Sequence, residues 1–317
     1  MDKKEAISET YYNDFKTFHN DIFFCGKFES KCIFRGESSD KYKLLPTSLR
    51  ESTMDIFSRY SMDINNNELS QKNNESLILQ DFYSYCDQSG KYIPDIKQFR
   101  DIPYGCTNYC IKKEETWLSE DLYILAGLAQ HYGLPTRLLD WSRDLFVALY
   151  FAVTGVLKKP EIESEYMVLW ALCASAIDSQ VFWNLNSVLT DGQDISKDKP
   201  MKIKIIKLPY YGNYNLAAQQ GLFTLSEVKI KCNNFTCNQA IDRTPLDEVI
   251  TNCITGSTFF NKNPQTLLHK MYISTKIAKI IFNYLNSIGY NASKIFPGIY
   301  GAARAVEERA LFSIKNR

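Results

Sequence analysis

Three short polar segments of the chain carry side chains that can bind anions or transfer protons. The first contains Phe34, Arg35 and Gly36 at the end of an apolar run. A planar guanidinium can hold a phosphate through two parallel hydrogen bonds, and glycine lets a ligand or backbone approach closely. Arg35 is therefore a candidate anion-binding residue, and its alternative role is an internal ion pair that contributes only to the fold.

The second segment, residues 130–142, joins two apolar stretches and is therefore expected to lie against the core. Polar groups buried there must bond one another, the backbone or a ligand. His131 can act as a general acid or base with a pKa near neutrality, or it can simply end a helix. Arg137 and Asp140 can bind a ligand or form an internal ion pair. The polar side chains of this segment include Gln130, His131, Thr136, Arg137, Asp140 and Ser142.

The third segment contains Gln219 and Gln220 directly before Gly221. Each glutamine amide offers a donor and an acceptor that can pair with a ligand amide. The alternative is a solvated turn that leads into a strand.

Helices and strands predicted on either side of these segments position them. Residues 31–35 are predicted to form a strand that ends at Gly36. A helix capped by Ser119 is predicted to stop at Gly133 and Pro135, and a second helix, capped by Ser142, is apolar almost all round. Further strands are predicted at residues 167–172, 201–208 and 221–228, and a last helix at 274–288. The strands and helices do not alternate strictly, so the predicted fold class is α+β.

The chain has 317 residues, 45 % of them apolar, which is enough for a large core. We expect a helical N-terminal extension over residues 1–25 and one domain over 26–317, with a helical insertion at about 51–118. Residues 184–199 read as a polar linker.

Composition excludes several classes of protein. Lysine and arginine total 37 against 36 aspartates and glutamates, so there is no overall attraction to nucleic acid or membranes. The most apolar run, residues 145–157, is shorter than the ~20 residues that span a bilayer and is predicted to be a buried helix. The polar N-terminus lacks a signal peptide, so we expect a cytoplasmic protein with no membrane partner.

The nine cysteines are predicted to be reduced and mostly buried, since their number is odd. The pairs Cys106 and Cys110, and Cys232 and Cys237, lack the spacing of a zinc ribbon, so no metal is expected.

Five lysines on two neighbouring predicted strands offer a basic face for phosphates, although solvated lysines on a sheet are commoner. They are Lys202, Lys204, Lys207, Lys229 and Lys231. No series of stacking aromatics or cluster of metal-binding carboxylates accompanies them.

Together the three segments resemble the FRG domain, named after its Phe-Arg-Gly motif. The first match covers residues 34–38, followed by 42–47 and Arg50. The second covers residues 131–142 and 148–152, and the third covers residues 219–224. A further C-terminal match covers residues 295–301. These matches follow the family's order. One departure is Asn215, where the family usually has an arginine.

The layout of the FRG motifs is similar to that of ADP-ribosyltransferases, which implies a split β-sheet core and NAD as substrate. By this resemblance Arg35 and Gly36 hold the NAD phosphate or ribose, and Thr136, Arg137 and Ser142 support the nicotinamide pocket. Gln219 and Gln220 occupy the third-motif position, where many such enzymes have a catalytic glutamate. A carboxylate that stabilises the ribosyl cation then has to come from Asp140 or Glu227, with His131 as a further catalytic candidate.

The resemblance implies an effector, a toxin or antiphage protein, that modifies a protein or nucleic acid and that an antitoxin or inhibitor protein restrains. The missing third-motif carboxylate and Asn215 favour an alternative, a non-catalytic FRG module that binds a nucleotide or nucleic acid.

Overall fold

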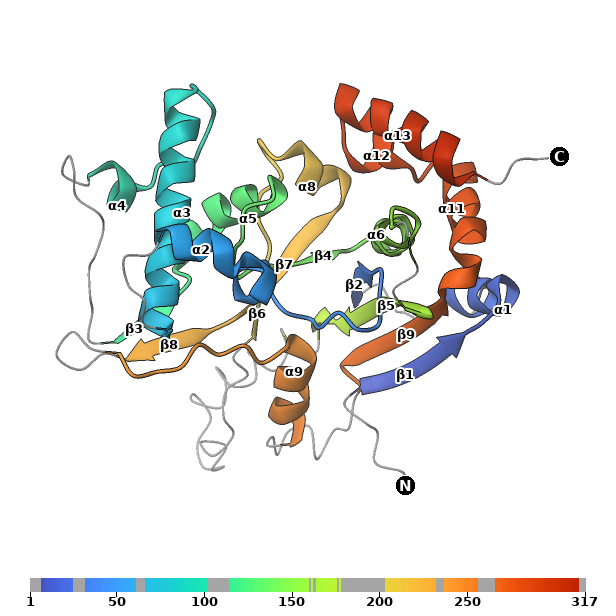
Figure 1. Cartoon of the computed structure of the whole chain (residues 1–317), viewed down its shortest axis with the longest axis horizontal. Coiled ribbons are helices and arrows are strands. Elements are labelled where there is room, and N and C mark those ends of the chain that lie inside the picture. The colour runs from blue at the N-terminus through green and yellow to red at the C-terminus, as the bar shows by residue number, and fades with distance from the viewer. Residues whose placement is uncertain are drawn as a thin grey trace.

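A seven-stranded sheet forms the centre of the computed structural model (Figure 1). The structure describes residues 7–24, 32–60, 66–101, 114–159, 161, 164–175, 177, 203–231, 237–255 and 266–313. The strand order is β1-β9-β5-β2-β4-β7-β6, and β1 runs parallel to β9 while the other neighbours are antiparallel. The strands of this sheet are β1 (Ile7–Tyr12), β2 (Cys32–Glu37), β4 (Leu139–Ser142), β5 (Tyr166–Cys173), β6 (Ile203–Ile206), β7 (Gly221–Ser226) and β9 (Leu268–Ser274).

A second sheet has two antiparallel strands, β3 (Glu114–Trp117) and β8 (Val228–Lys231). The helices are α1 (Phe15–His19), α2 (Met54–Tyr60), α3 (Glu68–Gln88), α4 (Lys97–Arg100), α5 (Tyr123–His131), α6 (Leu145–Leu157), α8 (Tyr214–Ala218), α9 (Leu246–Thr255), α11 (Ala278–Ser287), α12 (Ala292–Ile295) and α13 (Ile299–Phe312). Short 3₁₀ turns cover Thr47–Leu49, Glu51–Thr53, Glu120–Leu122 and Thr275–Ile277, and a π-helical turn covers Asn20–Phe24.

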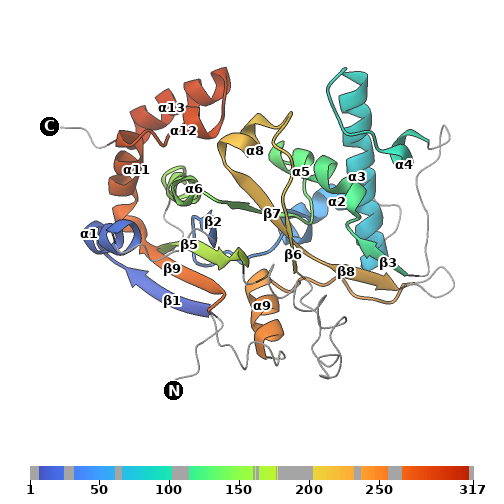
Figure 2. The same ribbon diagram turned by 180° about the vertical axis from the view of Figure 1, so that it is seen from behind.

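Helices cover both faces of the main sheet, which explains the continuous apolar runs of its central strands. On β5, Leu169 and Ala171 pack against α6, whereas Val168 and Trp170 pack on the opposite face with α9. Figures 1 and 2 show α6 and α9 on these opposite faces. A third apolar cluster joins α3, α5 and the small sheet to the far end of the main sheet. The predicted α+β class and the buried helix at residues 145–157 are confirmed.

The N-terminal segment is a strand where the sequence predicts a helical extension. Residues 7–12 form β1, and helical structure is confined to residues 15–24 within the described part. The segment is rich in β-branched and aromatic residues, which favour strands, and Tyr12 is fully buried. Parallel pairing with β9 makes this segment the edge of the main sheet.

Asp144, and not Ser142, caps helix α6. The Asp144 carboxylate accepts a hydrogen bond from the Phe146 amide at 2.9 Å, while Ser142 is the last residue of β4. Ser142 Oγ accepts a bond from the Asp144 amide at 2.9 Å and so supports the cap indirectly. Ser119 likewise makes no capping side-chain bond, because a 3₁₀ turn intervenes before α5.

The predicted helical insertion is bonded to the core. It contributes α2, α3 and α4, but its last residues form β3, which pairs with β8. Glu68 and Glu75 on α3 are buried and bond Arg137, at 2.6 Å to Nη2 and 2.9 Å to Nε. Trp117 Nε1 also donates to Glu75, at 2.5 Å. A buried ion-pair network therefore holds the insertion against the segment that follows α5.

The main sheet is weakly joined between β2 and β4. These strands share one paired position, Phe34 with Ser142, whereas β2 and β5 are paired over all six residues from Cys32 to Glu37. Beyond that single pair β2 and β4 diverge, and the side chain of Arg35 reaches across to Asp140.

Three lysines of the predicted basic face lie on strands of two different sheets. Lys229 and Lys231 lie on β8 in the second sheet, while Lys204 on β6 pairs with Glu120 and Glu227. These three described lysines therefore do not form the predicted basic face on two neighbouring strands. Lys202, Cys106, Cys110, Cys232 and the linker at 184–199 lie outside the described residues.

Among the described cysteines, all present as thiols, Cys237 is buried and the others are partly exposed. No three His, Cys, Asp or Glu side chains of the described ranges gather so that they could hold a metal ion. No helix in the described part of the chain combines the length and apolarity needed to cross a bilayer.

Candidate functional site

A cavity of about 290 Å³ lies between the C-terminal end of α5, the first turns of α6, and strands β2 and β4. Its volume is close to the lower end of the ~300–1,000 Å³ range of small-molecule sites. All three polar segments singled out in the sequence contribute to it. Its lining residues are Phe34, Arg35, Gly36, Gln130, His131, Asp140, Trp141, Ser142, Val147, Ala148, Phe151, Gln219 and Phe296.

Arg35 is held on one side and open on the other. Its Nε and Nη2 both lie 2.8 Å from Glu37 Oε1, and its Nη1 donates to the backbone carbonyl of Asp140 at 2.8 Å. Arg35 and Glu37 are two apart on β2, so their side chains share one face. A guanidinium has five N–H groups, so these bonds leave one on Nη1 and one on Nη2 without a partner among the described residues. Arg35 thus forms internal ion pairs and also lines the cavity.

A second arginine, Arg50, lies close to this group. Its Nε donates to the carbonyl of Leu45 at 2.9 Å. Burial lowers the pKa of Arg50, the positive charge of Arg35 lowers it further, and Glu37 and Asp140 raise it. Two guanidinium groups therefore lie near two carboxylates, and one of each, Arg35 and Asp140, lines the cavity.

Gln130 and Arg35 orient Asp140. Gln130 Nε2 donates to Asp140 Oδ2 at 2.8 Å, and Arg35 Nη1 lies 3.8 Å from the same oxygen. Gln130 Oε1 in turn accepts a hydrogen bond from Thr136 Oγ1 at 2.7 Å. The Asp140 side chain remains 46 % exposed, so this positioned carboxylate can still meet a ligand.

His131 presents a buried ring nitrogen without a hydrogen-bond partner. None of the described residues bonds its Nε2, and the ring packs edge-on against Phe223 at 6.1 Å between centroids. Burial lowers the pKa of His131, and the nearby Asp140 partly opposes this shift. The neutral imidazole is therefore favoured, which leaves it able to accept a proton.

Ser142 and Gln219 also line the cavity and join its walls. Ser142 Oγ donates to the backbone carbonyl of Gln219 at 2.7 Å. The side-chain amide of Gln219 donates to the carbonyl of Ile295 at 3.3 Å. Both groups are committed to the protein, so their main effect is to fix β4, α8 and α12 relative to one another.

Aromatic rings form the apolar wall. Phe151 on α6 and Phe296 after α12 meet edge to face, with centroids 6.0 Å apart. The guanidinium of Arg304 lies over the outer face of Phe296 at 4.4 Å. Such a wall suits one flat ring of a ligand.

Gly36 explains the last position of the Phe-Arg-Gly motif. A Cβ on Gly36 would lie 1.9 Å from the Ala148 carbonyl oxygen and 2.9 Å from the Ala152 amide nitrogen. The backbone that approaches Gly36 is therefore that of helix α6, which any side chain here would push out of position.

Three predicted site residues and Asn215 do not line the cavity. Thr136 is buried behind Gln130, and Arg137 is bonded to Glu68 and Glu75, not to Asp140. Gln220 is exposed, with its amide 3.5 Å from Asp144 Oδ2. Asn215, which stands where the FRG domain usually has an arginine, lies within α8 and does not line the cavity.

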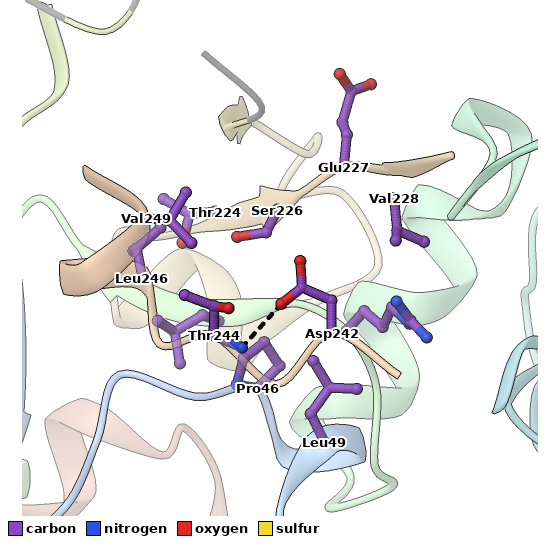
Figure 3. A pocket seen from close by; sticks show the side chains of 12 residues that line it. Pro46, Leu49, Thr224, Ser226, Glu227, Val228, Asp242, Thr244, Leu246 and Val249 are labelled. Carbon is purple, nitrogen blue, oxygen red and sulfur yellow. Dashed lines mark hydrogen bonds between the residues drawn. The ribbon is translucent and has the colours of Figure 1, made fainter. Parts of the chain in front are cut away.

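Glu227, the other carboxylate considered, lies elsewhere. It borders a separate cavity of about 30 Å³, roughly the volume of one water molecule, and pairs with Lys204 at 2.9 Å. Figure 3 shows its side chain pointing away from Asp242 and Thr244, which lie on the other side of that cavity. Asp140 is thus the single carboxylate among the described residues that line the larger cavity.

Sequence reasoning gave no site role to three supporting residues. Glu37 could have been found from its i, i+2 spacing to Arg35 on a strand. Gln130 was named among the polar side chains of the second segment, and it lines the cavity from the last turn of α5. Phe296 belongs to the C-terminal match at residues 295–301, but nothing in the sequence shows that its side chain reaches the cavity.

Comparison with family models gives one match, which covers part of the chain. No curated protein and no solved structure matches the chain. The model of the FRG domain matches residues 30–161, a region that runs from β2 to the end of α6 and contains Arg35, Asp140 and Ser142, so over this region the chain is similar to the FRG domain.

Proposed function

We propose that the chain is an ADP-ribosyltransferase that consumes NAD and modifies a macromolecule. The observation that carries the proposal is the cavity shared by Arg35, His131, Asp140 and Gln219, which come from all three motif segments. The sheet that separates between β2 and β4 is compatible with the split core of such enzymes.

The reaction begins with cleavage of the bond between C1′ of the ribose and the nicotinamide nitrogen. The bonding electron pair leaves with neutral nicotinamide, and positive charge develops on the ribose. A fixed carboxylate stabilises this charge without having to reorganise. Asp140 has that role in our proposal, because it is oriented by Gln130 and remains exposed to the cavity.

The other groups bind and align the reactants. The remaining N–H groups of Arg35 would hold a phosphate or the ribose, and the wall of Phe151 and Phe296 would receive the nicotinamide ring. An acceptor nucleophile then bonds to C1′ and loses its proton to His131 or Asp140. At about 290 Å³, the cavity suits the nicotinamide–ribose half of NAD, and the adenosine half would extend outside it.

The biological role follows from the family resemblance. We propose a cytoplasmic effector, a toxin or antiphage defence protein, that an antitoxin or inhibitor protein restrains in the producing cell.

A second candidate function is a nucleotide-binding module without turnover. It is favoured by Gln219, whose side chain is bonded to Ile295 and which supplies no carboxylate. In this case NAD or a related nucleotide would raise the melting temperature without being consumed.

The test is to incubate the purified protein with NAD labelled in its ADP-ribose part and with cell lysate. Nicotinamide release and label transfer are then measured for the wild type, Asp140→Asn and Glu227→Gln. We expect Asp140→Asn to lower turnover by about 10²–10³-fold, as for loss of one transition-state contact. The control Glu227→Gln removes the other candidate carboxylate and should keep full activity. Absence of turnover in the wild type, or equal turnover in Asp140→Asn, would refute the catalytic proposal.

A further inference from the structure

Tyrosines form an unusual group on the surface near the cavity. Nine large apolar or aromatic side chains among the described residues are more than 60 % exposed, and four of these lie on α13. The remaining five are all tyrosines. Three of them, Tyr92, Tyr211 and Tyr214, are 73 %, 83 % and 78 % exposed and come from two segments that meet.

Specific contacts bring these two segments together. The rings of Tyr92 and Tyr211 pack edge to face with centroids 5.7 Å apart. A Cβ on Gly212 would lie 3.6 Å from Tyr92 Cδ1, so the ring of Tyr92 also lies against the chain at Gly212. Tyr214 follows as the first residue of α8. We call Tyr92, Tyr210, Tyr211 and Tyr214, with Arg143, the tyrosine surface.

The tyrosine surface is continuous with the rim of the cavity. Arg143 directly follows Ser142, a lining residue, and its Nη1 bonds the hydroxyl of Tyr210 at 2.6 Å. Helix α8, which starts at Tyr214, leads directly to Gln219, another lining residue. A molecule lying on these rings would therefore reach the mouth of the cavity.

The 205–218 side of this surface has a charge that favours a polyanion, whereas on the Tyr92 side Lys91 lies between the exposed Asp87 and Asp95 in the sequence. Residues 205–218 contain Lys207 and no aspartate or glutamate. Lys91 precedes Tyr92, and Lys91, Lys207 and Arg143 are all exposed. Protruding aromatic rings between cations are the arrangement that binds single-stranded nucleic acid, because bases stack on the rings and phosphates contact the cations.

We infer that the tyrosine surface binds single-stranded nucleic acid and presents it to the cavity as the acceptor. This inference rests on the proposed function for the acceptor role, but the binding itself does not depend on NAD. A duplex hides the faces of its bases, so it should bind less well. A protein partner would more readily use the exposed aliphatic side chains of α13, Ile299, Val306 and Leu311.

The test measures fluorescence anisotropy of labelled single-stranded RNA, single-stranded DNA and duplex DNA of one sequence. We expect single-stranded RNA and single-stranded DNA both to bind. The one that binds more tightly is then the preferred acceptor. Tyr211→Ala and Tyr214→Ala should each weaken binding by about tenfold. The matched control is Tyr300→Ala, since Tyr300 is 72 % exposed but lies on α13 beside another hollow. Arg143→Gln should lower the slope of log affinity against log salt by about 0.7.

The two proposals can fail separately. Oligonucleotide binding without NAD consumption would support the tyrosine surface as a binding site and refute the proposed enzymatic activity. Nicotinamide release without oligonucleotide binding would support the proposed enzymatic activity and overturn the inference that the tyrosine surface binds nucleic acid. It is also overturned if Tyr211→Ala and Tyr214→Ala bind like Tyr300→Ala, or if the surface binds a protein and no oligonucleotide.

Discussion

Arg35 donates a 2.8 Å hydrogen bond to the backbone carbonyl of Asp140, a residue 105 positions later in the chain. The bond crosses the place where β2 and β4 diverge. It therefore joins the anion-binding candidate to the strand that carries the proposed catalytic carboxylate. Five measurable consequences of the site and its support can be tested.

Arg35→Lys should destabilise the protein although it keeps the charge. An ammonium group cannot bond Glu37 through two nitrogens and reach the Asp140 carbonyl at the same time. We expect a loss of about 1.5–3 kcal/mol in the free energy of unfolding, measured by urea denaturation. The exposed Arg309 on α13 offers a control, since Arg309→Lys should change little. Equal stability of the two variants would mean that the bonds of Arg35 contribute nothing.

Gly36→Ala should be severely destabilising. Its Cβ would overlap the backbone of α6, which cannot move without disturbing the core, so we expect a loss of about 3 kcal/mol or more. Gly289→Ala is the comparison, because φ there is +83° but the space around it is open, and only about 1–2 kcal/mol of backbone strain is expected. Thermal denaturation of both variants decides the matter, and similar melting temperatures would contradict the close approach.

Arg137→Met should destabilise the protein through the carboxylates that it leaves behind. Glu68 and Glu75 would remain buried without their cation, which typically costs about 3–5 kcal/mol. Arg100→Met removes a partner of Asp95 from an exposed ion pair and should cost about 1 kcal/mol or less. Chemical denaturation of both variants tests the contrast, and a small effect at Arg137 would show that the site tolerates unpaired carboxylates.

His131 should make stability depend on pH on the acid side. Its pKa is lowered in the folded protein relative to about 6.5 in the unfolded chain, so the unfolded state binds more protons between the two values. Stability therefore falls as pH falls below about 6.5 and is regained as pH rises. His131→Gln should flatten this slope in denaturation experiments.

Asp140→Asn gives an independent check of the same group. Asp140 raises the pKa of His131, so the variant should titrate His131 at a still lower pH, measured from its ring-proton resonance. An unchanged titration would place the Asp140 charge too far away to matter.

The sequence was informative where local physics decides the structure. The apolar run at 145–157 could only be a buried helix, and the run at 167–172 reads as a covered strand, as found in α6 and β5. The three polar segments were also recognised, because polar side chains between apolar elements need partners.

Long-range pairing was not accessible in the same way. Glu68 and Glu75 lie within a polar helix, and only the fold brings them to Arg137. The strand β1 depends on β9, more than 250 residues away, so its local pattern did not outweigh the expectation of a helix. Ser142 has the residue type of a helix cap, but it is the last residue of β4. Asp144, two residues later, caps α6 instead.

The wall at Phe296 and the bond from Gln219 to Ile295 mean that the cavity is assembled from residues 34 to 296. During translation, Arg35 and Asp140 leave the ribosome long before the segment that completes their surroundings. A nascent or prematurely terminated chain would carry these two residues without a closed site, so the proposed activity would begin only after synthesis is nearly finished.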